Sequence, residues 1–366
     1  MALTATSSGH LILNNETVKH LADTLDGRPD LLLSCGDVLI QRSNTIDLVG
    51  TTAVFDGPSG VYAYPDLMMR LRFKDPDTAH WFWRYANSSQ GRRYFATVAA
   101  GSTGSMPKIS GRHVREMPVL LPPAAERRAV ADVLNDVDRL LDAQDQLIAK
   151  KRNLLGAAMQ QLLTGRTRLP GFSGGWQKMR IVDIGSPRVE RNARRERLPV
   201  LTCSKHFGFV DSLGYFKNQV FSEDLSTYKT IRRDDIGYPA NHVEEGSIGL
   251  QNLYDVALVS PIYVVFSVDR NVNSYFLHRL LKLDSFRQQF RTATTSSVDR
   301  RGSLRWKAFS QITVELPPTI AEQATIAEVL SDMDAEIAAL ERRRDKARDL
   351  KQAMMQELLT GRTRLV

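Results

Sequence analysis

Apolar residues recur at alternating steps of three and four in two long stretches of the chain. In residues 122–169 they are Val130, Val133, Val137, Leu140, Leu147, Leu154 and Ala158, with breaks at Gln144 and Lys151. In residues 317–365 they are Ile326, Leu330, Met333, Ile337, Leu340, Ala347, Met354 and Leu358, with breaks at Arg344 and Lys351. This spacing places apolar side chains on one stripe of a helix, and such a stripe needs a partner. The pattern predicts two long helices, each entered through a Pro-Pro pair and ended by a glycine.

The two stretches are copies of each other. From Leu134 and Leu330 onward they align without a gap at an offset of 196, and both end in LLTGRTRL. Two matched copies favour pairing of one helix with the other over two separate amphipathic packing helices. The predicted core of this pairing is Val133, Val137, Leu140, Leu147, Leu154, Leu330, Met333, Ile337, Leu340 and Met354.

The remaining sequence reads as two mixed α/β modules with the same order of elements. Each has strand-like runs rich in β-branched and aromatic residues, then a helix, a polar loop and a short closing strand. The expected helices cover residues 80–98 and 274–290, and the closing strands are MPVLLP (117–122) and ITVELPP (312–318). The predicted domains are 1–121, 122–169 (first helix), 170–315 and 316–366 (second helix).

Charge is unevenly distributed along the chain. The net charge is +8, and residues 170–315 hold most of the excess with 21 basic against 15 acidic side chains. Fifteen of those 21 are arginine, which suits bidentate contacts with phosphates and guanine edges. The excess suggests nucleic acid, although solvated surface charge also explains such a value. Two distant cysteines and the lack of a signal sequence or long apolar run favour a reduced, cytoplasmic protein.

Motifs of catalysis are missing from the sequence. LLTGRT lacks the first glycine and the lysine of a phosphate-binding loop, and the sequence has neither an HExxH motif nor a CxxC pair. The seven histidines never cluster at ligand spacing. These absences predict a chain that is not an enzyme by itself and binds neither a metal nor a cofactor.

Two globular modules with LLPPAAERRAVADVLNDVD, ELPPTIAEQATIAEVLSDMD and two LLTGRTRL ends resemble the HsdS-like specificity (S) subunit of type I restriction-modification systems. The resemblance implies two α/β (α+β) target recognition domains, each reading one half of a bipartite double-stranded DNA target. It also implies an antiparallel coiled coil with pseudo-twofold symmetry on which two methyltransferase (M) subunits dock. S-adenosylmethionine would then belong to the M subunits, and ATP with Mg to the restriction (R) subunits, with no membrane involved.

The first module departs from this pattern at its start. The second opens with GFSGGWQKMRIVDIG, and the first has no such segment. Residues 1–169 are 27 fewer than residues 170–365, so the first module lacks the opening strand and the arginine-rich stretch equivalent to 186–197. We expect one of two explanations: the start of the gene is placed too late, or the protein is truncated. In the second case the first recognition domain should be unstable or read DNA poorly.

Polar loops supply the candidate DNA contacts. In the second module they are Lys205, His206, Asn241, His242, Arg300, Arg301, Arg305 and Lys307; in the first they are Arg42, Asn44, Ser102, Lys108, Arg112 and His113. Arg191, Arg194, Arg195 and Arg197 are expected to hold phosphates, and Lys150, Arg152, Arg342 and Arg343 to face the M subunits. Two alternatives stay open at this point: a coiled-coil adaptor that reads no DNA, and a specificity subunit of a type IIG-like nuclease-methyltransferase.

Overall fold

The chain forms two compact units in the computed structural model, which describes residues 1–20, 29–99, 106–241, 243–295 and 303–365. Unit 1 comprises Met1–Gln146 and Leu340–Val366, and unit 2 comprises Leu147–Ala339. Unit 1 is therefore built from two separate stretches, while unit 2 is continuous. Within the described ranges, no helix is both long and apolar enough to cross a membrane.

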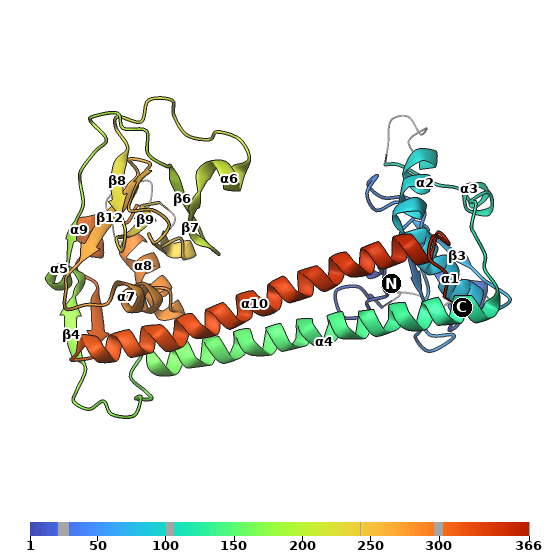
Figure 1. Ribbon diagram of the computed structural model, residues 1–366, viewed down its shortest axis with the longest axis horizontal. Coiled ribbons are helices and arrows are strands. Elements are labelled where there is room, and N and C mark those ends of the chain that lie inside the picture. The colour runs from blue at the N-terminus through green and yellow to red at the C-terminus, as the bar shows by residue number, and fades with distance from the viewer. Residues whose placement is uncertain (21–28, 100–105, 242, 296–302, 366) are drawn as a thin grey trace. The chain divides into compact units, whose positions relative to one another are not determined.

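Unit 1 contains a small antiparallel sheet covered by helices (Figure 1). Strand β1 (Val38–Gln41) lies between β2 (Thr52–Val54) and β3 (Met68–Leu71). The sheet is central to the fold because all four residues of β1 are buried. The helical elements of the module are η1 (Leu3–Thr6), η2 (Pro29–Leu31), α1 (Pro76–Asn87), α2 (Ser89–Ala99) and α3 (Gly111–Arg115).

The helix expected at 80–98 is two helices, α1 and α2, which meet at Ser88. The extended backbone of Ser88 (φ −69°, ψ 166°) ends α1. Its hydroxyl then accepts a hydrogen bond from the Gly91 N–H at 3.4 Å, so the same residue begins α2. Gly91 permits the tight junction because a Cβ there would lie 2.4 Å from the carbonyl oxygen of Ala86.

Unit 2 has one larger sheet with strand order β10-β9-β12-β5, and three two-stranded pairs, β11-β8, β6-β7 and β13-β4, all antiparallel. The helix expected at 274–290 is again two helices, α7 and α8. The strands are β4 (Gln177–Arg180), β5 (Gly185–Pro187), β6 (Leu201–Ser204), β7 (Gly208–Asp211), β8 (Lys229–Arg232), β9 (Ile236–Pro239), β10 (Gly249–Leu250), β11 (Val256–Val259), β12 (Tyr263–Val268) and β13 (Thr313–Leu316). The helices are α5 (Ile181–Ile184), α6 (Ser212–Phe216), η3 (Val243–Glu245), α7 (Ser274–Leu281), α8 (Asp284–Thr295) and α9 (Trp306–Phe309).

Aromatic rings fill the core of unit 2. Tyr238, Phe266, Phe290 and Phe309 are fully buried, and the rings of Tyr238 and Phe309 lie 4.6 Å apart between centroids. Large rings of this kind bury enough apolar area to hold a sheet against short helices. The core fixes β9, β12 and α9 relative to one another, and these three elements carry the site described below.

The two long helices, α4 (Ala124–Leu162) and α10 (Ile320–Leu358), each contribute to both units. Within unit 1, α4 and α10 are joined by ion pairs from Lys351 to Asp138 and from Arg344 to Asp145. Within unit 2, Lys151 Nζ lies 2.7 Å from Glu336 Oε1. From Asp138 to Asp145 on α4, the partner on α10 changes from Lys351 back to Arg344. The two helices therefore run antiparallel within unit 1. The charged residues that interrupt the apolar stripes are thus paired across the helices.

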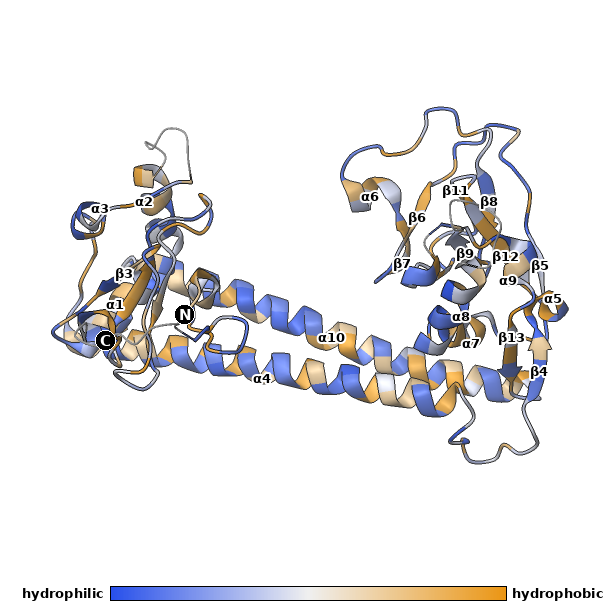
Figure 2. Ribbon diagram, turned by 180° about the vertical axis from the view of Figure 1, so that it is seen from behind, coloured by the Kyte–Doolittle hydropathy of each residue, from blue (hydrophilic) through white to orange (hydrophobic). Residues whose placement is uncertain are grey.

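The apolar stripe on α4 differs from the prediction. Leu140, Leu147 and Leu154 are 46%, 40% and 48% exposed, while Leu134 and Ile148 are buried. The prediction was wrong for those three leucines. Other apolar residues of α4 take the buried positions instead, because each end of the helix packs against the core of its own unit. Of the other predicted core residues, Leu330 and Ile337 are buried and Val133, Val137, Met333, Leu340 and Met354 are half-buried. Figure 2 shows hydrophilic and hydrophobic turns alternating along both helices.

The closing strand expected at MPVLLP is not formed. Residues 117–123 have no strand assignment, whereas the matching segment of unit 2 is β13, held by four residues of β4. Among the described residues of unit 1, nothing takes the place of β4 beside this segment. A strand forms only where a neighbouring strand supplies partners for its backbone N–H and C=O groups. The expected strand at 117–122 has no such neighbour and therefore does not form.

Candidate nucleic-acid interface

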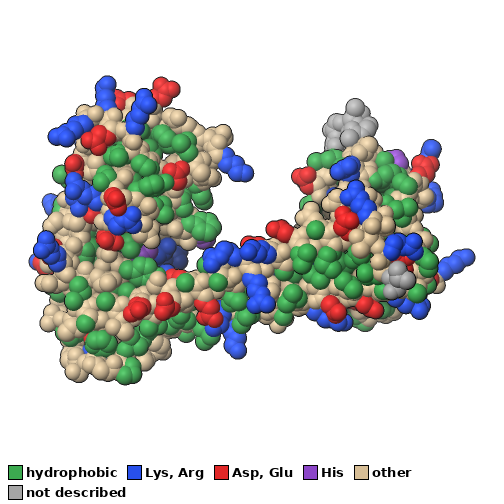
Figure 3. Space-filling model, in the orientation of Figure 1, with side chains coloured by type: hydrophobic (Ala, Val, Ile, Leu, Met, Phe, Trp, Pro, Cys, Tyr) green, Lys and Arg blue, Asp and Glu red, His purple; other side chains and the backbone are tan. Residues whose placement is uncertain are grey.

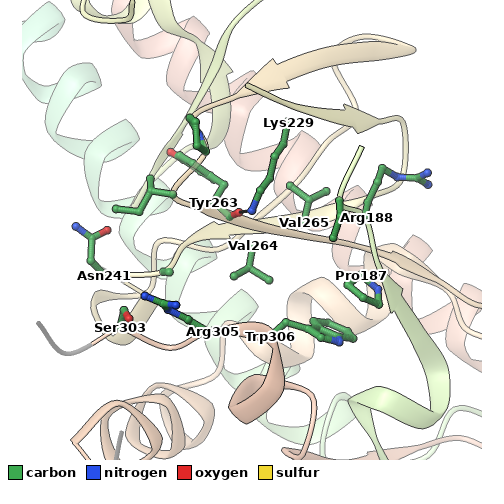
Figure 4. A pocket seen from close by; sticks show the side chains of 14 residues that line it. Pro187, Arg188, Lys229, Asn241, Tyr263, Val264, Val265, Ser303, Arg305 and Trp306 are labelled. Carbon is green, nitrogen blue, oxygen red and sulfur yellow. Dashed lines mark hydrogen bonds between the residues drawn. The ribbon is translucent and has the colours of Figure 1, made fainter. Parts of the chain in front are cut away.

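A cleft of about 700 Å³ lies against the main sheet of unit 2. Its floor is the first half of β12, Tyr263 to Val265, and one wall is β5 with the residues that follow it. The opposite wall combines the end of β9 with the approach to α9 (Figure 4). With Lys229 of β8, the cleft therefore joins five segments of the chain that lie between residues 187 and 306.

Two cations of the cleft are held in place by neighbouring groups. Arg188 donates from Nε and Nη2 to the carboxylate of Asp235, at 2.6 and 3.0 Å, and Asp235 is buried beneath it. Lys229 donates from Nζ to the Tyr263 carbonyl oxygen at 2.5 Å. Burial lowers the pKa of the Lys229 ammonium, and Arg191 lowers it further. Such fixed donors form a preorganised surface for an anion.

The charged side chains that line the cleft are all cations, and they lie among apolar residues such as Val264 and Trp306. Arg188, Lys229 and Arg305 line it, and no Asp or Glu is among its described lining residues. Figure 4 shows Asn241, Ser303 and Arg305 together at one end, and Arg188 at the other. Figure 3 shows Lys and Arg spread over the visible face of unit 2 with Asp and Glu among them, so this face carries mixed charge. The cleft differs from that surface by its lack of acids, which favours phosphate groups.

The structure brings two of the predicted second-module residues together. Asn241 follows β9 and Arg305 precedes α9, and both line the cleft. Lys307 is exposed on α9 outside the lining. Lys205 and His206 lie in the exposed β6–β7 turn and do not line it; there, Lys282 Nζ donates to the Lys205 carbonyl oxygen at 3.3 Å. The predicted residues Ser102, His242, Arg300 and Arg301 fall outside the described residues.

The first-module candidates form a smaller group. The Ile109 N–H donates to the Arg42 carbonyl oxygen at 2.9 Å, and a β-bridge pairs Ser43 with Lys108. Arg42, Asn44 and Lys108 are thereby brought to one edge although more than 60 residues separate them. Arg112 pairs with Glu116 at 2.7 Å on the exposed face of α3, and His113 lies on the same short helix.

Sequence reasoning did not single out Arg188 and Lys229. Arg188 lies within the arginine-rich stretch 186–197, which is a signal that could have found it. Lys229 stands alone at the start of β8, and only the pairing of strands places it against Tyr263. The four arginines of that stretch, Arg191, Arg194, Arg195 and Arg197, are all exposed.

Comparison with known proteins places these observations in a family. The model described as "Type I restriction modification DNA specificity domain" matches residues 175–347, which include the whole cleft. A solved structure described as the "Type-I restriction-modification system S subunit from M. genitalium" is 12% identical and has a TM-score of 0.54, with 90% of this chain and 84% of that chain covered. A second, titled for "complex assembly" and "conformational transition of the type I R-M system", is 16% identical with a TM-score of 0.54, covering 90% and 82%. At these identities the likeness shows the fold alone. None of the curated proteins matches the chain. Residues 175–347 thus match the type I restriction modification DNA specificity domain, and the chain shares its fold with the S subunit from M. genitalium.

Proposed function

We propose that this chain is the DNA specificity subunit of a type I restriction-modification complex and reads a bipartite target, with one recognition domain per half-site. The observation that carries the proposal is the cationic cleft without acids inside the residues that match the specificity domain. Fixed arginine and lysine donors would position phosphates, and Asn241 with Arg305 would reach base edges. The group around Arg42 and Lys108 would serve the other half-site.

The long helices support a spacer role in this proposal. Their ion pairs run antiparallel within each unit, and the copied sequence gives the same contacts at both ends. We infer that α4 and α10 form one antiparallel coiled coil with pseudo-twofold symmetry, which fixes the distance between the half-sites as in dimeric DNA-binding proteins. M subunits that carry S-adenosylmethionine, and R subunits that use ATP and Mg, would supply the catalysis.

The DNA proposal is tested by measuring how the chain, with its M subunit, binds DNA that carries the sequence methylated in the host. We expect Arg305→Ala and Asn241→Ala to weaken binding of the chain with its M subunit at least tenfold. Arg305→Ala should also relax the sequence preference at the base pair it contacts, because a base-edge contact carries specificity. The matched control is Arg270→Ala, an exposed arginine of unit 2 outside the cleft. Equal losses in all three variants would refute a role for the cleft.

Docking of the M subunits is tested separately from DNA binding. Lys150, Arg342 and Arg343 are exposed on α4 and α10, as is Arg152. We expect the double change Arg342→Glu with Arg343→Glu to reduce co-purification of the M subunit. Exposed acidic residues lie on the same helices, and Glu328→Lys serves as the charge-change control. Undiminished co-purification of the arginine variant would place the M subunit on another surface.

A further inference from the structure

Helix α7 and the residue that ends it separate polar side chains from apolar ones. The polar side chains, spaced by three and four along the sequence, are Tyr275, His278, Arg279 and Lys282. The apolar ones, which are buried in the core of unit 2, are Phe276, Leu277, Leu280 and Leu281. Residues three and four apart lie on the same side of a helix. The polar stripe is therefore left at the boundary of the core, with two cations and a histidine on it.

A cavity of about 150 Å³ lies beside this polar stripe, and we call it the α7 hollow. All four polar residues line it, together with residues of the β6–β7 hairpin and of the segment at the end of β10. These further lining residues are His206, Phe207, Gly208, Phe209, Leu250 and Asn252. None of the described lining residues is an Asp or Glu. The hollow lies at the β10 edge of the main sheet, whereas the cleft lies against β12 and β5.

The positive charge of the α7 hollow is only partly neutralised. Arg279 Nη2 lies 3.0 Å from Asp334 Oδ2 on α10. Lys282 has no ion-pair partner within the described ranges, and its Nζ donates to the Lys205 carbonyl oxygen at 3.3 Å. Burial lowers the pKa of the Lys282 ammonium, and Arg279 and Arg287 lower it further. An anion in the hollow would therefore offset repulsion between like charges.

Two nitrogen atoms of the polar stripe are buried without a hydrogen-bond partner in the part of the chain that the structure describes. They are Arg279 Nε and His278 Nδ1. A buried polar atom without a partner lowers stability, because it has lost its hydrogen bonds to water. Both side chains line the α7 hollow. An oxygen-rich ligand there would supply hydrogen-bonding groups that the chain itself does not.

The turn between β6 and β7 holds an aromatic ring at the open side of the hollow. The strands pair as far as Ser204 and Gly208, and the φ of +67° at Gly208 closes a loop of three residues. The Ser204 hydroxyl oxygen accepts hydrogen bonds from the N–H groups of His206 and Phe207, at 3.3 and 3.4 Å. The side chain of Phe207 is 73% exposed. The backbone beneath the ring is thus fixed, while the ring itself is uncovered.

These features define the chemical class of the ligand. Lys and Arg donors without acids beside them suit a phosphate group. The volume of about 150 Å³ is well below the roughly 300–1,000 Å³ of pockets that enclose a whole small molecule, so the hollow suits one group of a larger ligand. An exposed aromatic ring next to a cationic site is the arrangement on which nucleotide bases stack.

We propose that the α7 hollow binds one phosphate group of a nucleotide through Lys282 and Arg279, with the nucleoside part against the ring of Phe207. Two sources present this chemistry, a unit of a DNA strand and a free nucleoside phosphate, and binding experiments separate them. The hollow and the cleft share no lining residue, so this site is independent of the base contacts proposed for Asn241 and Arg305.

Calorimetric titration of the full chain with 2′-deoxyadenosine 5′-monophosphate tests the free nucleotide as the source. We expect saturable binding that Lys282→Gln weakens about tenfold or more, since this change removes a charged donor. Phe207→Leu keeps an apolar side chain on the exposed turn but removes the ring, and should weaken binding about fivefold or more, whereas Phe207→Tyr should restore it. Deoxyadenosine, which lacks the phosphate, should not bind. The matched control is Lys178→Gln, which changes an exposed lysine of β4 outside the hollow.

Anisotropy of a labelled DNA duplex without the methylated motif tests a DNA strand as the source. Between about 50 and 200 mM salt, Lys282→Gln should then reduce the slope of log K against log salt by about 0.9, the value for one phosphate, and Lys178→Gln should leave it unchanged. In that case the free nucleotide should show no saturable binding. Because this duplex carries no target sequence, the result does not depend on base reading at the cleft. The proposal is overturned if Lys282→Gln changes neither nucleotide binding nor the salt slope, or if Lys178→Gln has the same effect.

Discussion

His278 gives a stability prediction with a defined sign. The half-buried imidazole lies on α7 of unit 2, with Nε2 3.3 Å from the Ile248 carbonyl oxygen. Burial lowers the pKa of His278 to about 3, and Lys282 and Arg279 add to the lowering. In the unfolded chain the imidazole has its ordinary pKa of 6.5. The folded protein therefore keeps this histidine neutral where the unfolded chain binds a proton.

The depressed pKa makes unit 2 less stable in mild acid. As the pH falls below about 6.5, the unfolded state takes up a proton that the folded state excludes. The contribution of His278 to the free energy of unfolding is fully present above that pH and is lost as the pH falls towards 3. At pH 5 the two pKa values imply a loss of about 2 kcal/mol relative to pH 8, at about 1.4 kcal/mol for each unit.

The assay is urea unfolding of the wild-type chain and His278→Gln at pH 8 and pH 5. Because the two units need not unfold together, a hydrogen-exchange labelling pulse at one fixed pH, read by mass spectrometry, follows unit 2 alone. We expect the wild type to lose about 2 kcal/mol more than the variant between these pH values. The control His206→Gln removes an exposed histidine of the same unit. Parallel behaviour of the wild type and His278→Gln would refute the reasoning.

Two further substitutions test the packing of each unit. Arg168→Met leaves the carboxylate of Glu322 buried without its partner, so we expect a loss of about 3–5 kcal/mol in urea unfolding of unit 2. Arg364→Met breaks the copied pair with Glu126, whose arginine is 62% exposed, and should cost about 1 kcal/mol or less; equal losses would contradict this ranking. Gly50→Ala should destabilise unit 1 by more than about 2 kcal/mol, because φ is +79° and the new methyl would lie 2.4 Å from a buried ring, and an unchanged thermal midpoint would contradict it.

The sequence predicted the long helices well because their signal is local and repeated. The observed bounds of α4 and α10 fall inside the predicted stretches, and both have 39 residues. Which apolar face of α4 is buried could not be predicted in the same way. Leu134 and Leu140 both belong to apolar patterns of helical spacing, and only Leu134 is buried. Packing of Leu134 onto the module of unit 1 decides between them.

The cleft was predicted only in part, because strand pairing brings its residues together. Asn241 and Arg305 lie in polar loops, and loop chemistry is visible in a sequence. Lys229 lies in a strand, and its place beside Tyr263 depends on contacts across 34 residues. The missing closing strand has the same cause. MPVLLP has a strand-like composition, yet the strand forms only where a neighbour such as β4 supplies hydrogen bonds.

The division of unit 1 into two stretches has a consequence for biosynthesis. Its first stretch ends at Gln146, and its second begins at Leu340 and runs to Val366. A ribosome that adds about 5–20 residues per second needs roughly 10–40 seconds to make the 220 residues (366 − 146) between the end of the first stretch and the last residue. During that time Val130 and Leu134 await their partners Leu358 and Leu359, while unit 2 is made without interruption. The module that is begun first is thus completed last, and its apolar helix face stays uncovered until the final turn of α10 has been made.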